Sequence, residues 1–187
     1  MSPVTHFLLS WSVASNTHLD RRDRTLVTLA GISPDLDGVG LLWDLATRQP
    51  GQHLTLWSTY HHILGHNITF GVMLALLAAA CASRRIATGT AAFFVFHLHL
   101  FCDFLGSKGP DENWSIPYLL PFSDVWDFVW VGQWPLVSWQ NFFITISALV
   151  FVVYQSWRQG FSPLEFISKR ANCAFVSALR IRFGTPL

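Results

Sequence analysis

Histidines and aspartates placed in or beside apolar segments are the residues of this sequence best suited to chemistry. The stretch YHHILGHN comes directly before a long apolar run. If this stretch and the run form one helix, His62 and His66 lie four residues apart on one face and could reach a common metal ion. His61 is five residues from His66, and the two converge only if Gly65 loosens the turn. Either His61 or His62 could therefore be the ligand that accompanies His66.

A second pair lies in the next apolar segment, in the stretch HLHLFCD. Helical spacing puts His99 and Asp103 on one face and His97 nearly opposite. An aspartate at membrane depth costs about 2.5–3.5 kcal/mol on insertion scales, so it normally faces a cavity, a partner or a metal. A single intramembrane histidine is more often a hydrogen-bonded packing residue, but two pairs together favour a shared site.

Two weaker signals come earlier in the chain. The stretch SPDLDG places Asp35 and Asp37 two residues apart in a turn marked by a proline and a glycine. Aspartates in such turns usually cap a helix or form an Asx-turn. His6 is a lone histidine near the N-terminus and predicts nothing by itself.

The composition is typical of a membrane protein. Of the 187 residues, 51% are hydrophobic and 12% are charged, and the mean hydropathy is +0.37, whereas soluble domains carry about 25% charged residues. The net charge is only +1, so nothing favours nucleic acid as a partner. The three cysteines are far apart in the sequence and indicate free buried thiols.

Three segments approach the roughly 20 apolar residues that cross a bilayer, namely about 63–83, 86–106 and 137–157. The sequence therefore predicts an all-α integral membrane bundle with about three transmembrane helices. Polar stretches and Pro34 interrupt the first sixty residues, which favours short re-entrant or interfacial helices there.

Charged residues predict the orientation. Arg84 and Arg85 lie in the turn between the first two spans, and the C-terminal tail is basic, whereas the connection 107–136 has one lysine and four acidic residues. By the positive-inside rule, the turn and the tail are cytoplasmic and the connection faces outward. The first span then runs inward from His66 and the second returns outward to Asp103. Both pairs are therefore expected towards the outer end.

Residues 161–187 are predicted to form a basic amphipathic tail after a membrane-embedded domain of residues 1–160. Ser162, Pro163 and Glu165 have the spacing of an N-cap with a capping box, so a helix should begin there. Its apolar and basic residues mostly separate onto different faces. This pattern suits either the anionic cytoplasmic interface or ordinary packing.

Taken in order, five motifs resemble the YdjM-like family of inner-membrane metal-dependent hydrolases: TH at 5–6, SPDLD at 33–37, HHILGHN at 61–67, HLHLFCD at 97–103 and LLPFS at 119–123. The resemblance spans residues 5 to about 123 and implies a multi-pass protein of the bacterial inner membrane. Matched residue by residue, it implies a metal site formed by His6, Asp35, Asp37, His61, His66, His99 and Asp103.

Two departures from the family pattern concern the substrate side of such a site. His62 stands where the family usually has arginine, and Gly65 and Asn67 replace a threonine and a serine. If the family's arginine grips a phosphate, His62 is a weaker and pH-dependent catalytic substitute for it.

Seven ligands exceed what one four-coordinate zinc requires, so one or two divalent ions are expected, either zinc or manganese. Such a centre could generate hydroxide near neutral pH and stabilise the oxygens of a phosphoester. The predicted activity is phospholipase-like hydrolysis of a phosphoester in a membrane lipid or lipid-linked substrate. Asp37, if it is not a ligand, is the expected general base or orients a ligand.

A different class of function competes with this prediction. A non-catalytic protein that handles metal ions or protons, such as a transporter subunit, could use the same side chains as a relay. A path should show polar residues through the membrane, but the third span offers only Thr145 and Ser147 in its apolar stretch, which favours a site over a path. A scaffold with incidental histidines is a third interpretation. The sequence does not indicate the oligomeric state.

Overall fold

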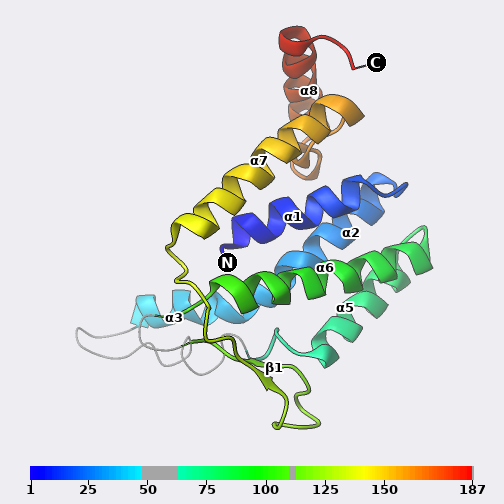
Figure 1. Ribbon diagram of the computed structural model, residues 1–187. Coiled ribbons are helices and arrows are strands. Elements are labelled where there is room, and N and C mark those ends of the chain that lie inside the picture. The colour runs from blue at the N-terminus through cyan, green and yellow to red at the C-terminus, as the bar shows by residue number, and fades with distance from the viewer. Residues whose placement is uncertain (48–62, 110–112, 187) are drawn as a thin grey trace.

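The computed structural model describes residues 1–47, 63–109 and 113–186, and these are mostly helical (Figure 1). A small antiparallel ribbon pairs Ile116 with Phe128. In chain order the elements are α1 (Pro3–Ser15), α2 (Arg21–Ile32), the 3-10 segment η1 (Ser33–Val39), α3 (Gly40–Thr47), α5 (Ile68–Cys81), α6 (Arg85–Gly106), β1 (Ile116–Pro117), β2 (Asp127–Phe128), α7 (Trp139–Gln159), the 3-10 turn η2 (Pro163–Phe166) and α8 (Lys169–Phe183).

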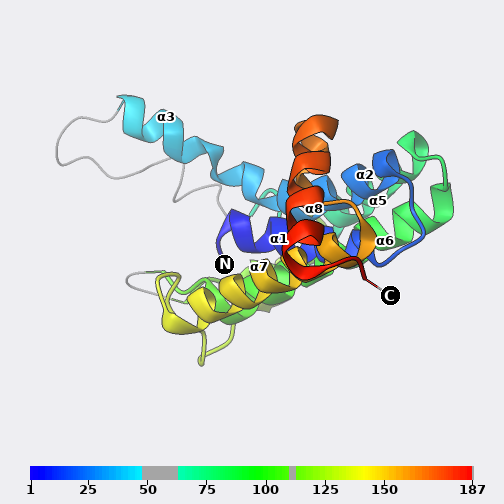
Figure 2. The same cartoon turned by 90° about the horizontal axis from the view of Figure 1, so that it is seen from above.

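Helix α1 lies at the centre of the bundle. It packs against α2, α6 and α7, while α5 and α6 form a hairpin and α2 packs against both. Figure 1 shows α8 standing away from the bundle, and Figure 2 shows α3 projecting from the other helices. The N-terminal helices are thus central to the structure, not peripheral segments attached to the predicted spans.

Small residues let the central helices approach closely. Ala14 of α1, Ala30 of α2 and Ala92 of α6 belong to one buried apolar cluster. A Cβ atom on Gly31 would lie 1.9 Å from the Ser10 Oγ atom, so the contact between α1 and α2 requires glycine there. Trp11 is fully buried between α1 and α7.

Asp23 joins α2 to the turn between α5 and α6. Its carboxylate is fully buried and accepts hydrogen bonds from the Ser83 and Arg84 backbone N–H groups, both at 2.8 Å, and from the Thr88 hydroxyl at 2.9 Å. A buried carboxylate needs such donors to offset its lost hydration. Asp23 therefore fixes where the α5–α6 hairpin sits on α2.

The predicted capping box at the start of the tail is wrong. Glu165 forms a bidentate ion pair with Arg24 at 2.8 and 3.0 Å, and the Ser162 side chain caps no helix. Only the short turn η2 begins there, and the α-helix starts at Lys169 with Ser168 as its N-cap. The long-range ion pair takes the glutamate that a capping box would need.

The structure supports one of the three predicted membrane spans. Among the described residues, α6 alone has the length and apolar composition to cross a bilayer, with 22 residues and a mean hydropathy of 1.3 over an 18-residue stretch. Helix α5 has only 14 residues, which falls short of the roughly 20 that a span needs. Helix α7 has 21 residues, but polar side chains at its ends dilute its apolar character. The three-span bundle is therefore not confirmed.

The cysteines were predicted to be free and buried. All three are free, but only Cys102 is buried, while Cys81 and Cys173 are exposed.

Candidate metal centre

Helix α6 places His99 and Asp103 on one face, as their spacing predicts. The His99 Nε2 atom lies 3.0 Å from Asp103 Oδ2, and both residues are buried. His97 points elsewhere, because its Nδ1–H donates to the Phe93 carbonyl and its Nε2 accepts from the Tyr118 hydroxyl, both at 2.8 Å.

Helix α1 adds a second imidazole. The His6 Nε2 atom lies 3.1 Å from Asp103 Oδ1, and the His6 ring stacks on the His99 ring with 3.7 Å between centroids. The Met1 amino group and the Ser107 hydroxyl also donate to Asp103 Oδ1. Asp103 is thus the carboxylate on which several elements converge.

A third imidazole comes from the segment before α5. His66 Nε2 lies 3.2 Å from His99 Nε2 and 3.4 Å from Asp103 Oδ2. Residues 63–67 are not helical, contrary to the prediction. The Asn67 side chain accepts from the Phe70 N–H and caps α5, so the helix begins at Ile68. His66 therefore reaches the other histidines from a turn.

Asp35 of η1 completes the group. Its Oδ1 atom lies 3.7 Å from His99 Nε2, and burial raises the pKa of this carboxyl. Ligand atoms of His6, Asp35, His99 and Asp103 all lie within 4.8 Å of one another. With His66, these residues are called the His/Asp cluster below.

Asp37 lies behind His66. Its Oδ2 atom accepts from His66 Nδ1–H at 3.0 Å and from the Gly65 N–H at 3.1 Å. A Cβ atom on Gly65 would lie 2.5 Å from the Pro34 carbonyl oxygen, so this close approach of the turn to η1 requires glycine. Asp37 holds His66 with its Nε2 atom turned towards the cluster.

The protonation of His66 reflects these carboxylates. Burial alone lowers the pKa of a histidine, but hydrogen bonds and charges from Asp103 and Asp37 outweigh it and raise the pKa of His66 to about 9. Without a metal ion, His66 is therefore protonated at neutral pH. A metal ligand must be the neutral imidazole, so an ion would have to displace this proton.

One polar atom tests whether a cation fits the cluster. The Asp35 Oδ2 atom is buried and has no hydrogen-bond partner in the described part of the chain. Buried polar atoms are rarely left unpaired, and an ion is one explanation for those that are. Three imidazoles and two carboxylates are also a donor set that divalent ions accept. The His/Asp cluster could hold a metal ion.

The structure thus brings together five of the seven residues predicted as ligands and places Asp37 beside them. His61 and His62 lie outside the described residues. The sequence motifs did not predict a role for Gly31, whose carbonyl accepts from His99 Nδ1–H at 2.8 Å. That bond leaves His99 Nε2 free to face the cluster. No sequence motif marks such a backbone partner, although a glycine in α2 opposite a predicted histidine helix is a weak signal.

Comparison with known proteins identifies the family but not an activity. No curated protein and no solved structure matches the chain significantly. The family model described as YdjM inner membrane protein matches residues 1–179. This match extends beyond the five motifs to include α7 and most of α8. The chain belongs to the YdjM inner membrane protein family.

Proposed function

We propose that the protein is a membrane-bound metal-dependent hydrolase that acts on a phosphoester of a lipid or lipid-linked substrate. The observation that carries the proposal is the convergence of three imidazoles, from His6, His66 and His99, on the buried carboxylate of Asp103. Burying five polar ligands from four separate segments costs free energy, because each polar group loses its hydration. A purely structural scaffold does not require such an arrangement.

The ligands that we assign are the five residues of the His/Asp cluster. They suit one or two ions of zinc or manganese, since both accept mixed nitrogen and oxygen ligands. Bound there, such an ion would polarise a phosphoryl oxygen and lower the pKa of water towards neutrality.

The chain's own residues would prepare this site. Asp37 and the Gly31 carbonyl each hold the outer nitrogen of one histidine, which fixes the tautomer and aims Nε2 inward. The Asp37 side chain is only 2% exposed. This supports a role in orienting His66 over a role as a general base that meets water from outside.

The loop after α6 supplies a place for an apolar substrate. Its backbone is tied to the start of α5, because Ile68 N–H donates to the Tyr118 carbonyl and the Thr69 hydroxyl to the Leu120 carbonyl. Phe122 and Trp126 in this loop are exposed. Because hydrogen bonds hold this loop next to His66, its exposed aromatic side chains support the proposal that the loop guides an acyl chain to the cluster.

We further propose a multi-pass arrangement with the His/Asp cluster towards the outer face. Helices α5 and α7 both expose large apolar side chains, among them Leu76, Leu77, Phe142 and Phe143, which suit contact with lipid. The basic turn precedes α6, whereas His99 and Asp103 lie near the C-terminal end of this helix, so turn and cluster lie at opposite ends of α6, as the positive-inside rule requires for an outer site.

A proton path is less well supported than a site. Buried polar residues do continue along the bundle, and Thr5 and Thr145 pair their hydroxyls between α1 and α7, but several other hydroxyls are used locally. Ser15, Thr28 and Ser156 each donate to a carbonyl three or four residues earlier on their own helix. Bonds within one helix do not form a chain of exchanging partners between helices.

The proposal is tested first by metal content. The protein is purified in detergent without chelator, and bound metal is measured by mass spectrometry in the wild type and in the His66→Ala and Asp103→Ala variants. His97→Ala is the matched control, because His97 lies on α6 but outside the cluster. We expect one or two equivalents of zinc or manganese in the wild type and the control, and a loss in the other two variants.

Activity is tested on the same four preparations with phospholipids and lipid-linked phosphates. Hydrolysis that follows metal content across the variants would support the proposed function. A wild type that neither contains metal nor takes up added zinc or manganese would contradict it. A metal-loaded protein without hydrolysis of any phosphoester would leave the non-catalytic metal-handling function as the better explanation.

A further inference from the structure

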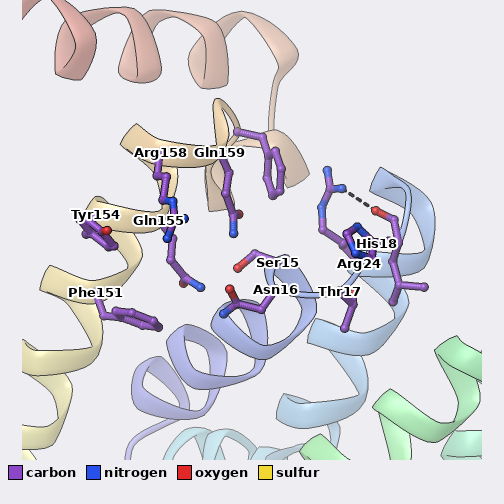
Figure 3. Close-up of a pocket in the computed structure, with 12 residues that line it drawn as sticks. Ser15, Asn16, Thr17, His18, Arg24, Phe151, Tyr154, Gln155, Arg158 and Gln159 are labelled. Atoms are coloured by element: carbon purple, nitrogen blue, oxygen red, sulfur yellow. Dashed lines mark hydrogen bonds between the residues drawn. The ribbon is translucent and has the colours of Figure 1, made fainter. Parts of the chain in front are cut away.

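An open cavity of about 660 Å³ lies where α1 ends, between the C-terminal end of α7 and the start of α2 (Figure 3). This is the opposite end of α1 from His6. Ser15 and His6 are nine residues apart, which is about 14 Å along the helix. The cavity is therefore separate from the His/Asp cluster and does not belong to the proposed hydrolytic site.

The charged groups that line this cavity are arginines. Arg24 and Arg158 contribute to its wall beside the His18 ring, and no acidic side chain of the described residues does. The Arg24 guanidinium is paired with Glu165, whereas Arg158 forms no ion pair with any described residue. The positive charge of Arg158 therefore favours an anionic ligand.

Two glutamines from α7 add hydrogen-bonding groups that lack partners. The Oε1 atoms of Gln155 and Gln159 are buried without a hydrogen-bond partner in the described structure, and Gln155 is only 3% exposed. Both side chains extend from α7 towards the end of α1 in Figure 3. An amide oxygen accepts hydrogen bonds, so a matching ligand carries hydroxyl or amine groups as well as negative charge.

The cavity is continuous with an apolar surface on α7. Phe151 and Tyr154 line the cavity and are both exposed, as are Ile146, Leu149 and Val150 on the same helix. A tyrosine beside an arginine at the end of an apolar helix is typical of the boundary between acyl chains and headgroups. The surface and the cavity together match the two parts of a phospholipid.

We propose that this cavity binds the headgroup of an anionic phospholipid with a hydroxylated headgroup, such as phosphatidylglycerol, while the acyl chains lie along the exposed face of α7. Arg158 contacts the phosphate, and the two glutamine oxygens accept from the headgroup hydroxyls. The bound lipid is not the hydrolysed one, because it lies at the other end of the bundle. It anchors the protein at the basic, cytoplasmic end.

Lipid titrations of the full chain, followed by native mass spectrometry from detergent, test this assignment. Phosphatidylglycerol is compared with phosphatidylcholine, which has no net charge and no hydroxyl donor. The variants are Arg158→Ala and Gln159→Leu, and the matched control is Arg22→Ala, since Arg22 is exposed at the same end and does not line the cavity. A third titration adds sn-glycerol 3-phosphate as a competitor without acyl chains.

We expect the wild type and Arg22→Ala to bind phosphatidylglycerol alike and more tightly than phosphatidylcholine. Arg158→Ala should weaken phosphatidylglycerol binding about tenfold, as expected for a lost charge-assisted hydrogen bond, and Gln159→Leu should weaken it by a smaller factor. Equal binding of the two lipids, or an equal loss in Arg22→Ala, would overturn the proposal. Competition by glycerol phosphate at matched concentration would show a soluble ligand and would also overturn it.

Discussion

Each histidine of the His/Asp cluster has two ring nitrogens, and what the outer one contacts decides what the inner one can do. His66 Nδ1–H donates to a carboxylate and His99 Nδ1–H to a backbone carbonyl, so in each neutral ring the Nε2 lone pair faces inward. The His6 Nδ1 atom has no partner among the described residues. His66 and His99 are therefore preset as ligands, whereas His6 has more freedom to turn.

Asp37 is predicted to act through His66. The Asp37→Asn variant keeps all five ligands but replaces a charged acceptor with a neutral one, so His66 becomes less basic and less firmly oriented. Loss of such an outer partner typically lowers metal affinity about 10–100-fold, and we expect that range from competition with a chelator. Unchanged affinity in Asp37→Asn, measured beside the Asp103→Ala variant as the full-loss reference, would contradict this role.

The pKa of His66 predicts how the metal-free protein responds to pH. Because its pKa rises from 6.5 to about 9 on folding, protonated His66 stabilises the folded state fully below pH 6.5. This stabilisation, on the order of 3 kcal/mol, is lost as the pH rises through 9. In EDTA and detergent, the melting temperature should therefore fall more steeply between pH 6.5 and 9 in the wild type than in His66→Asn. Parallel curves would contradict the assignment.

At the scale of single residues, local spacing in the sequence predicted part of the His/Asp cluster. A separation of four residues within a helix was enough to pair His99 with Asp103 and to turn His97 away. The role of Asp37 was left open, because its contact with His66 joins two segments 29 residues apart. Long-range contacts of that kind have no local pattern.

At the scale of elements, the turn before α5 must approach η1 closely for His66 to meet Asp37. Gly65 permits this approach, and a Cβ atom there would collide with the Pro34 backbone. Gly65→Ala should therefore separate the two segments and weaken metal binding without removing any ligand. Chelator competition measures the effect, and Gly132→Ala, in the loop after α6, is a control of the same type. Equal metal affinity in the two variants would contradict this prediction, because it would show that the turn can move away from η1 without disturbing the ligands.

Asp23 is predicted to carry more stability than an ordinary helix cap. Asp23→Ala leaves three donors unpaired at the α5–α6 turn, which should cost on the order of 3 kcal/mol. Asp20→Ala removes the N-cap of α2, a loss of about 1 kcal/mol. Thermal unfolding in detergent should rank Asp23→Ala well below Asp20→Ala. Equal melting temperatures would mean that the hairpin is held by apolar packing alone.

Prediction of the elements succeeded where apolar pattern and local breaks agreed. The α5–α6 hairpin follows from two apolar runs around a basic turn, and its position is as expected. The start of α5 was misplaced, because the preceding histidines look helical by spacing while Asn67 caps the helix after them. The start of the helix in the tail was misplaced because Glu165 pairs with Arg24, 141 residues away.

At the scale of the whole molecule, the two ends differ in the groups that they carry. The His/Asp cluster and the loop that follows α6 lie at the C-terminal end of α6, and the turn with Arg84 and Arg85 lies at its start. Asp23 ties this turn to the start of α2, where Arg24 lines the proposed lipid cavity. A bilayer with anionic lipids on its cytoplasmic side attracts the basic end. The proposed hydrolytic site and the proposed lipid anchor would then face opposite sides of the membrane.

Labelling with a membrane-impermeant maleimide tests this orientation. Cys173 in the tail is exposed and is kept in a Cys81→Ser variant. Val131 in the loop after α6 is 87% exposed and is probed as Val131→Cys in a variant with Cys81→Ser and Cys173→Ser. In intact spheroplasts we expect the loop thiol to react and Cys173 to react only after disruption.

The reverse pattern would mean that the orientation is the opposite of the proposed one, with the cluster on the cytoplasmic side and the lipid cavity in the outer leaflet. Labelling of both thiols from outside would require an even number of crossings between them and would overturn α7 as a span.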